Sequence, residues 1–215
     1  MRRPLVVVAA ALCAANLLAE IAGVHWVVYL LKPLATLSLA ILASQVTHPT
    51  RYSRWISFGL LASLGGDVLL MLPFNLFVPG LLAFLVAHLC YISAIAGDGA
   101  GLKAPRAAAL PVFGIAVALL AFLWPSLGAL RIPVAAYVCV IATMAWQAIS
   151  RWRVIGTQGA LLAAGGACCF LASDASLALR RFVAPFTGAT LLVMLTYYLA
   201  QWGLALSVYD AERRA

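Results

Sequence analysis

Long apolar segments recur along the whole chain, and they constrain the fold more than any other feature. Eight of them run for roughly 18 to 24 residues, enough to cross about 30 Å of hydrocarbon as an α-helix. They cover residues 4–24, 27–46, 55–72, 76–96, 106–124, 132–150, 158–179 and 184–207. Hydrophobic residues make up 66% of the 215 positions and charged residues 9%, whereas soluble domains carry about 25% charged residues. The solvent of this chain is therefore a lipid bilayer.

The same segments predict the fold class. A segment inside a bilayer must satisfy its own backbone hydrogen bonds, and a helix does so without a partner segment. The connections between the segments leave no room for a further soluble domain. We therefore expect an all-α integral membrane protein in which residues 1–215 form a single bundle of eight transmembrane helices.

The N-terminal stretch MRRPLVVVAAALCAANLLAE has a second interpretation, because a basic start and an apolar centre are also typical of a signal peptide. A lipoprotein site at Cys13 would need a small residue at position 12, where this chain has Leu12. The apolar stretch also continues past Asn16 to Gly23. We interpret it as the first membrane helix.

Basic residues are distributed unevenly between the two sides of the predicted bundle. One side is flanked by Arg2, Arg3, Arg51, Arg54, Lys103, Arg106, Arg151, Arg153, Arg213 and Arg214. The other side is flanked by Arg131, Arg180 and Arg181. Because cytoplasmic loops are enriched in Lys and Arg, we expect both termini in the cytoplasm and the protein in the inner membrane of a bacterium. Topology thus accounts for the net charge of +8, and no nucleic-acid partner is expected.

Four ionisable side chains lie inside the predicted helices: Glu20, Lys32, Asp67 and Asp174. With a rise of about 1.5 Å per residue, each lies roughly 6 to 10 Å from the non-cytoplasmic end of its helix. Charges inside a membrane are costly, and they mark a functional cavity by default. The alternative is a structural network in which Lys32 pairs with Glu20 or with an aspartate and joins helices together.

Other polar side chains lie on the same helices or share helix faces. They are His88, Tyr91, Ser173, Tyr197, Tyr198 and Gln201. For each of them, a hydrogen-bonded packing role is the alternative to a functional one. Residues 107–124 of the fifth segment include no side chain more polar than tryptophan, and we expect this segment to face lipid.

A faint internal repeat relates the two halves of the chain. A shift of 107 residues superposes Asp67 on Asp174, Tyr91 on Tyr198 and Gly59 on Gly166. Four helices in each half would make this a parallel 4+4 repeat, with its axis along the membrane normal. The two aspartates would then occupy equivalent positions on either side of a central cavity.

Five motifs in this order carry a resemblance to a known family. They are KPLAT at 32–36, LGGDVLLML at 64–72, AFLVAHLCY at 83–91, GGACCFLASDASLALRRF at 165–182 and TYYLAQWGLALS at 196–207. Together they resemble the YhhN family of membrane proteins, which includes the lysoplasmalogenases. The resemblance implies a multispanning fold and aspartates as the favoured catalytic groups. It also implies hydrolysis of the vinyl-ether bond of a lysophospholipid, lysoplasmalogen, to a fatty aldehyde and glycerophosphoethanolamine or glycerophosphocholine.

The implied chemistry suits two carboxyl groups. Hydrolysis of a vinyl ether needs an acid that protonates carbon, an anion near the resulting oxocarbenium ion and a base for water, much as glycosidases need paired carboxyl groups. Two such groups in one low-dielectric site titrate as a unit, so that Asp67 and Asp174 can supply one protonated and one ionised member. His88 is the third catalytic candidate, as a residue that orients water or relays the proton.

The remaining candidates are expected to bind substrate. Lys32 either holds the lipid phosphate, which suits an ammonium group, or neutralises Glu20. The other candidate substrate-binding residues are Glu20, Ser173, Tyr91, Tyr197, Tyr198 and Gln201. No cofactor is expected.

A zinc site is the competing mechanism, since a catalytic zinc typically has three protein ligands. The histidines are His25, His48 and His88. The first two fall near opposite membrane faces and do not converge with the third, so we predict metal-free chemistry.

Two other classes of function remain open. Intramembrane acids also build the proton relays of transporters, which favour helices interrupted near the substrate site. A non-catalytic lipid-binding or scaffold protein is favoured if both aspartates prove dispensable.

Overall fold

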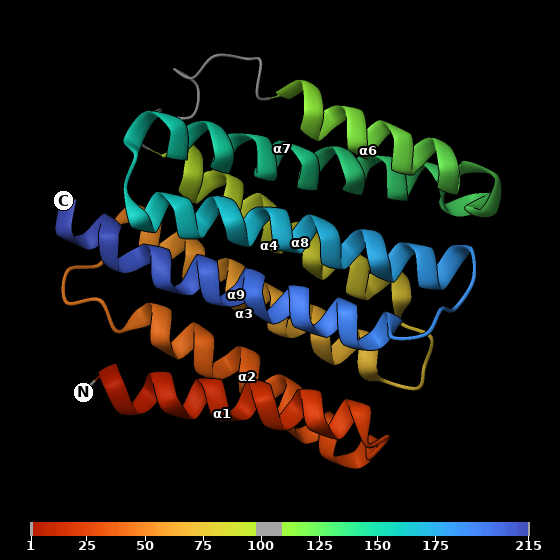
Figure 1. Ribbon diagram of the computed structural model, residues 1–215, viewed down its shortest axis with the longest axis horizontal. Coiled ribbons are helices and arrows are strands. Elements are labelled where there is room, and N and C mark those ends of the chain that lie inside the picture. Colours follow the sequence, from red (N-terminus) through yellow and green to blue (C-terminus); the bar gives the residue numbers. More distant parts are fainter. Residues whose placement is uncertain (1, 98–108, 215) are drawn as a thin grey trace.

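The computed structural model describes residues 2–97 and 109–214, and these ranges are helical without any β-strand (Figure 1). The long helices are α1 (Arg2–Ile21), α2 (His25–Ser44), α3 (Arg51–Met71), α4 (Phe77–Ala96), α6 (Ala109–Leu123), α7 (Arg131–Ile155), α8 (Gln158–Phe182) and α9 (Ala189–Arg214). Two short 3-10 helices, Trp124–Ser126 and Gly128–Leu130, join α6 to α7. Within the described ranges, eight helical spans are long and apolar enough to cross a membrane. The prediction of an all-α, multi-pass membrane protein is confirmed.

Several helix boundaries differ from the apolar segments. Helix α7 continues past residue 150 to Ile155 and ends at Gly156, whose φ of 70° is easily adopted by glycine. The extension carries Arg151, which is buried with its guanidinium 4.7 Å from the centre of the Tyr52 ring. The Arg151 side chain interrupts the apolar pattern, so the predicted segment ends before it. The helix itself continues, because the buried guanidinium stacks on an aromatic ring inside the bundle.

Helix α9 begins later than predicted, at Ala189 instead of residue 184. Pro185 disfavours helical geometry in the residue before it, and Gly188 has a φ of 79°. The start of the fifth predicted segment, residues 106–108, lies outside the described residues, as do Lys103 and Arg106.

The central helices form two close pairs. Helix α3 packs mainly against α4, and α8 packs mainly against α9, which runs beside it in Figure 1. A Cβ atom on Gly203 of α9 would lie 2.5 Å from the carbonyl oxygen of Leu162 on α8, and one on Gly166 would lie 2.9 Å from that of Ala200. Glycine on both helices thus lets their backbones approach, as small residues do between membrane helices.

The two termini lie at the same end of the bundle in Figure 1, as an even number of crossings requires. Which end faces the cytoplasm stays a prediction. Helices α3 and α8 start 107 residues apart, and each has a threonine N-cap, Thr50 and Thr157, that accepts a backbone hydrogen bond. This correspondence is in line with the 4+4 repeat, which also stays a prediction.

Candidate functional site

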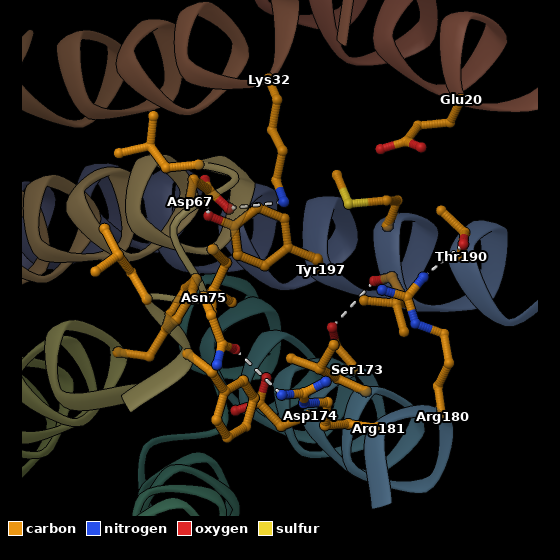
Figure 2. Close-up of a pocket in the computed structure, with 18 residues that line it drawn as sticks. Glu20, Lys32, Asp67, Asn75, Ser173, Asp174, Arg180, Arg181, Thr190 and Tyr197 are labelled. Carbon is orange, nitrogen blue, oxygen red and sulfur yellow. Dashed lines mark hydrogen bonds and ion pairs between the residues drawn. The ribbon is translucent and has the colours of Figure 1, made fainter. Parts of the chain in front are cut away.

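A polar cavity opens at the end of the bundle opposite the termini (Figure 2). Its volume is about 420 Å3. Its wall is formed by Glu20, Lys32, Asp67, Leu70, Leu72, Asn75, Leu76, Phe77, Phe84, Ser173, Asp174, Leu177, Arg180, Arg181, Thr190, Val193, Met194 and Tyr197. All four ionisable side chains of the predicted layer therefore line one cavity, and they reach it from α1, α2, α3 and α8.

Asp67 lies in the wall of this cavity and is surrounded by donors. Its side chain is 1% exposed, and its Oδ2 accepts hydrogen bonds from Thr36 Oγ1 at 2.7 Å and from Tyr197 OH at 2.5 Å. Its Oδ1 lies 3.4 Å from Lys32 Nζ. Helices α2 and α9 thus hold a carboxyl group that α3 presents.

A chain of hydrogen bonds continues from Asp67 into the core. Tyr197 OH accepts from Gln201 Nε2 at 2.8 Å, and Gln201 Oε1 accepts from Tyr91 OH at 3.1 Å. The Tyr91 hydroxyl also lies 3.1 Å from Ser63 Oγ. Each hydroxyl or amide donor in this series finds an acceptor. The hydrogen bonds from Gln201 and Tyr91 therefore hold the Tyr197 hydroxyl in its orientation toward Asp67.

Asp174 has a different environment. Its Oδ2 accepts from Tyr137 OH at 2.5 Å and lies 3.2 Å from His88 Nε2, and those two groups are themselves 2.9 Å apart. The side chain of Asp174 is 16% exposed, and no described residue bonds its Oδ1. The His88 ring is fully buried, and its Nδ1 has no hydrogen-bond partner among the described residues. A proton on Nε2, donated to Asp174, leaves Nδ1 as an acceptor and avoids a buried N–H without a partner.

The two carboxyl environments are built from helices that correspond in the predicted repeat, although the bonding residues themselves are not related by the shift of 107 residues. Asp67 on α3 accepts from α2 and α9, whereas Asp174 on α8 accepts from α7 and α4. Between them lies Phe170, a fully buried ring whose centre is 4.7 Å from that of His88 and 5.6 Å from that of Tyr197. The Phe170 ring therefore forms an apolar partition between the hydrogen-bond network of Asp67 and that of Asp174. Both carboxyl groups also line the cavity.

The predicted site residues do not all reach the cavity. Ser173 lines it and donates to the carbonyl oxygen of Val193 at 3.0 Å. Tyr198 is 3% exposed, packs against the ring of Tyr197 and is absent from the cavity wall. The buried residues His88, Tyr91 and Gln201 are absent from the cavity wall: His88 and Gln201 bond the wall residues Asp174 and Tyr197, and Tyr91 bonds Gln201.

Lys32 contacts an aspartate, one of the partners considered from the sequence. Its ammonium pairs with Asp67, and in the described part of the chain it makes no ion pair with Glu20. The structural alternative, in which Lys32 pairs with an aspartate, is therefore present in the structure, but the pair lies in the wall of an open cavity.

Sequence reasoning missed four residues at the site. Thr36 and Tyr137 each donate to an aspartate, and Arg180 and Arg181 line the cavity, whereas the sequence indicates for them a role in topology only. Helical spacing contains a signal for the arginines, because Arg180 follows Ser173 and Arg181 follows Asp174 by seven residues, which is close to two turns.

The described residues include no group of three or more His, Cys, Asp or Glu side chains placed to hold a metal ion. His25 begins α2 and His48 follows its C-terminal end, so α2 separates the two. Metal-free chemistry stays a prediction.

Comparison with known proteins assigns the family. The YhhN family model matches residues 27–208, which include both aspartates and the side chains that bond them. The chain belongs to the YhhN family.

Named relatives of this YhhN protein come from animals and bacteria. A bovine protein named lysoplasmalogenase TMEM86A is 36% identical over 203 residues, which cover 87% of this chain and 80% of the relative. A protein of Mycobacterium bovis named lysoplasmalogenase is 38% identical over 165 residues, which cover 72% of this chain and 61% of the relative. A membrane protein YhhN of Escherichia coli is 32% identical and is covered over 73% of its length. No solved structure matches the chain.

Proposed function

We propose that this YhhN-family protein is a lysoplasmalogenase, an ether hydrolase that cleaves the vinyl-ether bond of a lysoplasmalogen. Relatives named for that activity support the reaction class. The observation that carries the proposal is the pair of aspartates from α3 and α8 in the wall of one membrane cavity, each with different partners. The substrate is a lysophospholipid of the surrounding bilayer, and the products are a fatty aldehyde and a glycerophosphodiester.

The different partners support different roles. Asp67 pairs with Lys32 and accepts two hydrogen bonds, so it acts as the fixed anion that stabilises an oxocarbenium ion. Asp174 accepts both of its hydrogen bonds on Oδ2. A proton on its Oδ1 would meet no competing protein group among the described residues, so Asp174 acts as the acid.

The reaction then proceeds in three balanced steps. Asp174 gives its proton to the β-carbon of the vinyl ether, and the C=C electron pair forms the new C–H bond, which leaves an oxocarbenium ion at the α-carbon. Water adds to that carbon and returns a proton to the Asp174 carboxylate, which gives a hemiacetal. The hemiacetal bond from carbon to the glycerol oxygen breaks, and the hemiacetal O–H proton passes to that oxygen, so that the products are an alcohol and an aldehyde. His88 and Tyr137 keep Oδ2 of Asp174 occupied throughout, so that the proton leaves from and returns to Oδ1.

The unbroken helices at the site weigh against the transporter alternative. Transport sites typically use discontinuous helices near mid-membrane, whereas α3 runs from Arg51 to Met71 and α8 from Gln158 to Phe182 without a break.

The proposal is tested with purified protein in detergent and a 1-alkenyl lysophospholipid, with aldehyde release as the readout. We expect aldehyde to form without added metal and in the presence of a chelator. The saturated 1-alkyl ether should stay intact, because it has no double bond to protonate. Asp174→Asn should lower kcat about 10²- to 10⁴-fold, the usual contribution of a general acid, and Asp67→Asn about 10²- to 10³-fold.

The matched control is Asp210→Asn. Asp210 lies at the other end of the bundle, where it accepts from Thr157 Oγ1 at 2.7 Å, and its loss should leave kcat within about twofold if the variant is folded. Asp174 is excluded from the mechanism if the Asp174→Asn variant has the wild-type unfolding temperature and still releases aldehyde at the wild-type rate. Uptake of a lysolipid into vesicles without any aldehyde would favour transport instead.

A further inference from the structure

Two arginines at the end of α8 enter the mouth of the cavity and are held there by neutral groups (Figure 2). Arg180 Nη1 donates to Thr190 Oγ1 at 2.6 Å. Arg181 Nη2 donates to Asn75 Oδ1 at 3.3 Å, and its guanidinium carbon lies 5.3 Å from the centre of the Phe77 ring. In the described ranges, neither guanidinium makes an ion pair with a carboxylate. Each still has N–H groups free to bind an anion, and its planar fork suits phosphate.

The cavity also contains a carboxylate that the proposed reaction does not use. Glu20, at the end of α1, faces the cavity in Figure 2 and makes no ion pair with a described residue. Glu20 belongs, with Arg180 and Thr190, to a neighbouring hollow of about 560 Å3 beside the start of α9. Opposite charges that make no ion pair among the described residues thus lie on the walls of the same outer space.

An apolar slot continues from the cavity past Asp174. Its volume is about 50 Å3, and Asp174, Leu70, Phe77, Phe84 and Leu177 line both the slot and the cavity. The rest of its wall is apolar apart from Tyr137, with Leu119 and Leu123 from α6 and Ala178 from α8 among its residues. This slot admits a few carbons of a hydrocarbon chain, and Asp174 stands at its entrance.

The spacing along α8 links the mouth to the slot. Arg181 lies two turns beyond Asp174, which is about 10 Å along the helix axis. That span is comparable with the glycerol carbons and ether oxygen that separate the phosphate of a lysolipid from the first carbons of its chain.

Resting on the function proposed above, we propose that the mouth of the cavity selects a zwitterionic phosphodiester head group. Arg180 and Arg181 bind its phosphate, and Glu20 binds its ammonium group. The bound head group places the first carbons of the chain in the slot beside Asp174. The site therefore discriminates against lysolipids whose phosphate carries no amine.

Binding is measured with lipids that the enzyme does not cleave, so that the result does not depend on turnover. The two probes are a 1-alkyl glycerophosphoethanolamine and the matching 1-alkyl glycerophosphate, titrated into the full chain in detergent by calorimetry. Glu20→Gln should weaken binding of the ethanolamine lipid about tenfold, as loss of a hydrogen-bonded charge contact does. Binding of the phosphate lipid should stay within about twofold. Equal changes for both lipids, or no change for either, would overturn the amine contact.

The phosphate contacts are tested by Arg180→Gln and Arg181→Gln, each of which should weaken binding of both lipids about tenfold. Arg180→Lys and Arg181→Lys keep the charge and should recover part of the loss. The matched control is Arg131→Gln, an exposed arginine on the same predicted side that is absent from the cavity wall. A loss no larger than that of the control would overturn the phosphate site.

The position of the chain is tested by filling the slot. Ala178→Phe should weaken binding of the ethanolamine lipid about tenfold and leave binding of glycerophosphoethanolamine, which has no chain, within about twofold. Ala172→Phe adds the same ring to an exposed position of α8 and should change neither. A lipid that binds Ala178→Phe as tightly as the wild type would overturn the slot. If these results hold and no aldehyde is released, the head-group site stands and the proposed reaction fails.

Discussion

Replacement of Lys32 by methionine tests the electrostatics of the cavity apart from any reaction. The ammonium lies 3.4 Å from Asp67 Oδ1, and Asp67 is 1% exposed. At an effective dielectric constant of about 20, two charges at that separation attract by about 5 kcal/mol. The full value is not lost, because Lys32 is 14% exposed to the cavity and because Thr36 and Tyr197 still donate to the carboxylate. We expect Lys32→Met to lower the free energy of unfolding by about 2–4 kcal/mol.

A double-mutant cycle isolates this contribution. In Asp67→Asn the amide oxygen still accepts from Thr36 and Tyr197, and the charge that needed Lys32 is gone. The double variant Lys32→Met/Asp67→Asn should therefore lose at least about 1.5 kcal/mol less than the two single losses combined. Thermal unfolding in detergent reports the effect, at about 2–4 °C per kcal/mol for a chain of this size. Arg131→Met, which removes an exposed cation, should shift Tm by less than Lys32→Met does. Losses that simply add would refute the buried ion pair.

Two further substitutions test the packing behind the site. Phe170→Ala removes a fully buried ring and should lower the free energy of unfolding by about 3–5 kcal/mol in a denaturant titration; a loss below about 1 kcal/mol would contradict the partition role. Gly59→Ala places a methyl group 2.2 Å from Cε1 of the fully buried Tyr91 ring and should cost about 1–3 kcal/mol by overpacking. Gly65→Ala, with no heavy atom within 4 Å, is its control and should be neutral or stabilising; equal Tm values for the two variants would count against the close α3–α4 contact.

The sequence contained enough information to predict the helices and the depth of the ionisable side chains. Length and apolarity define each span, and the rise per residue placed Glu20, Lys32, Asp67 and Asp174 at one level. Which of them touch depends on the rotation of each helix about its axis, and a single sequence does not specify that rotation. For this reason the pairing of Lys32 with Asp67 was one of several possibilities.

The arginines of α8 show a second reason. A basic residue at a helix end enters the comparison of loop charges whether or not it also lines a cavity. Arg180 and Arg181, on the side with fewer basic residues, are therefore interpreted from the sequence as part of the topology alone. Tyr137 was missed as a partner of Asp174 because the donor and acceptor come from different helices and have no fixed spacing. The late start of α9 at Ala189 could have been predicted from Pro185 and Gly188, since both residues disfavour a continuous helix.

Helix α4 supplies one residue to each carboxyl environment: His88 bonds Asp174, and Tyr91 supports Asp67 through Gln201 and Tyr197. These two residues are three positions apart on the same helix. A small rotation or translation of α4 therefore changes the surroundings of both carboxyl groups at the same time. Any substitution on its lipid-facing side that alters its tilt will therefore affect the anion and the proton donor jointly.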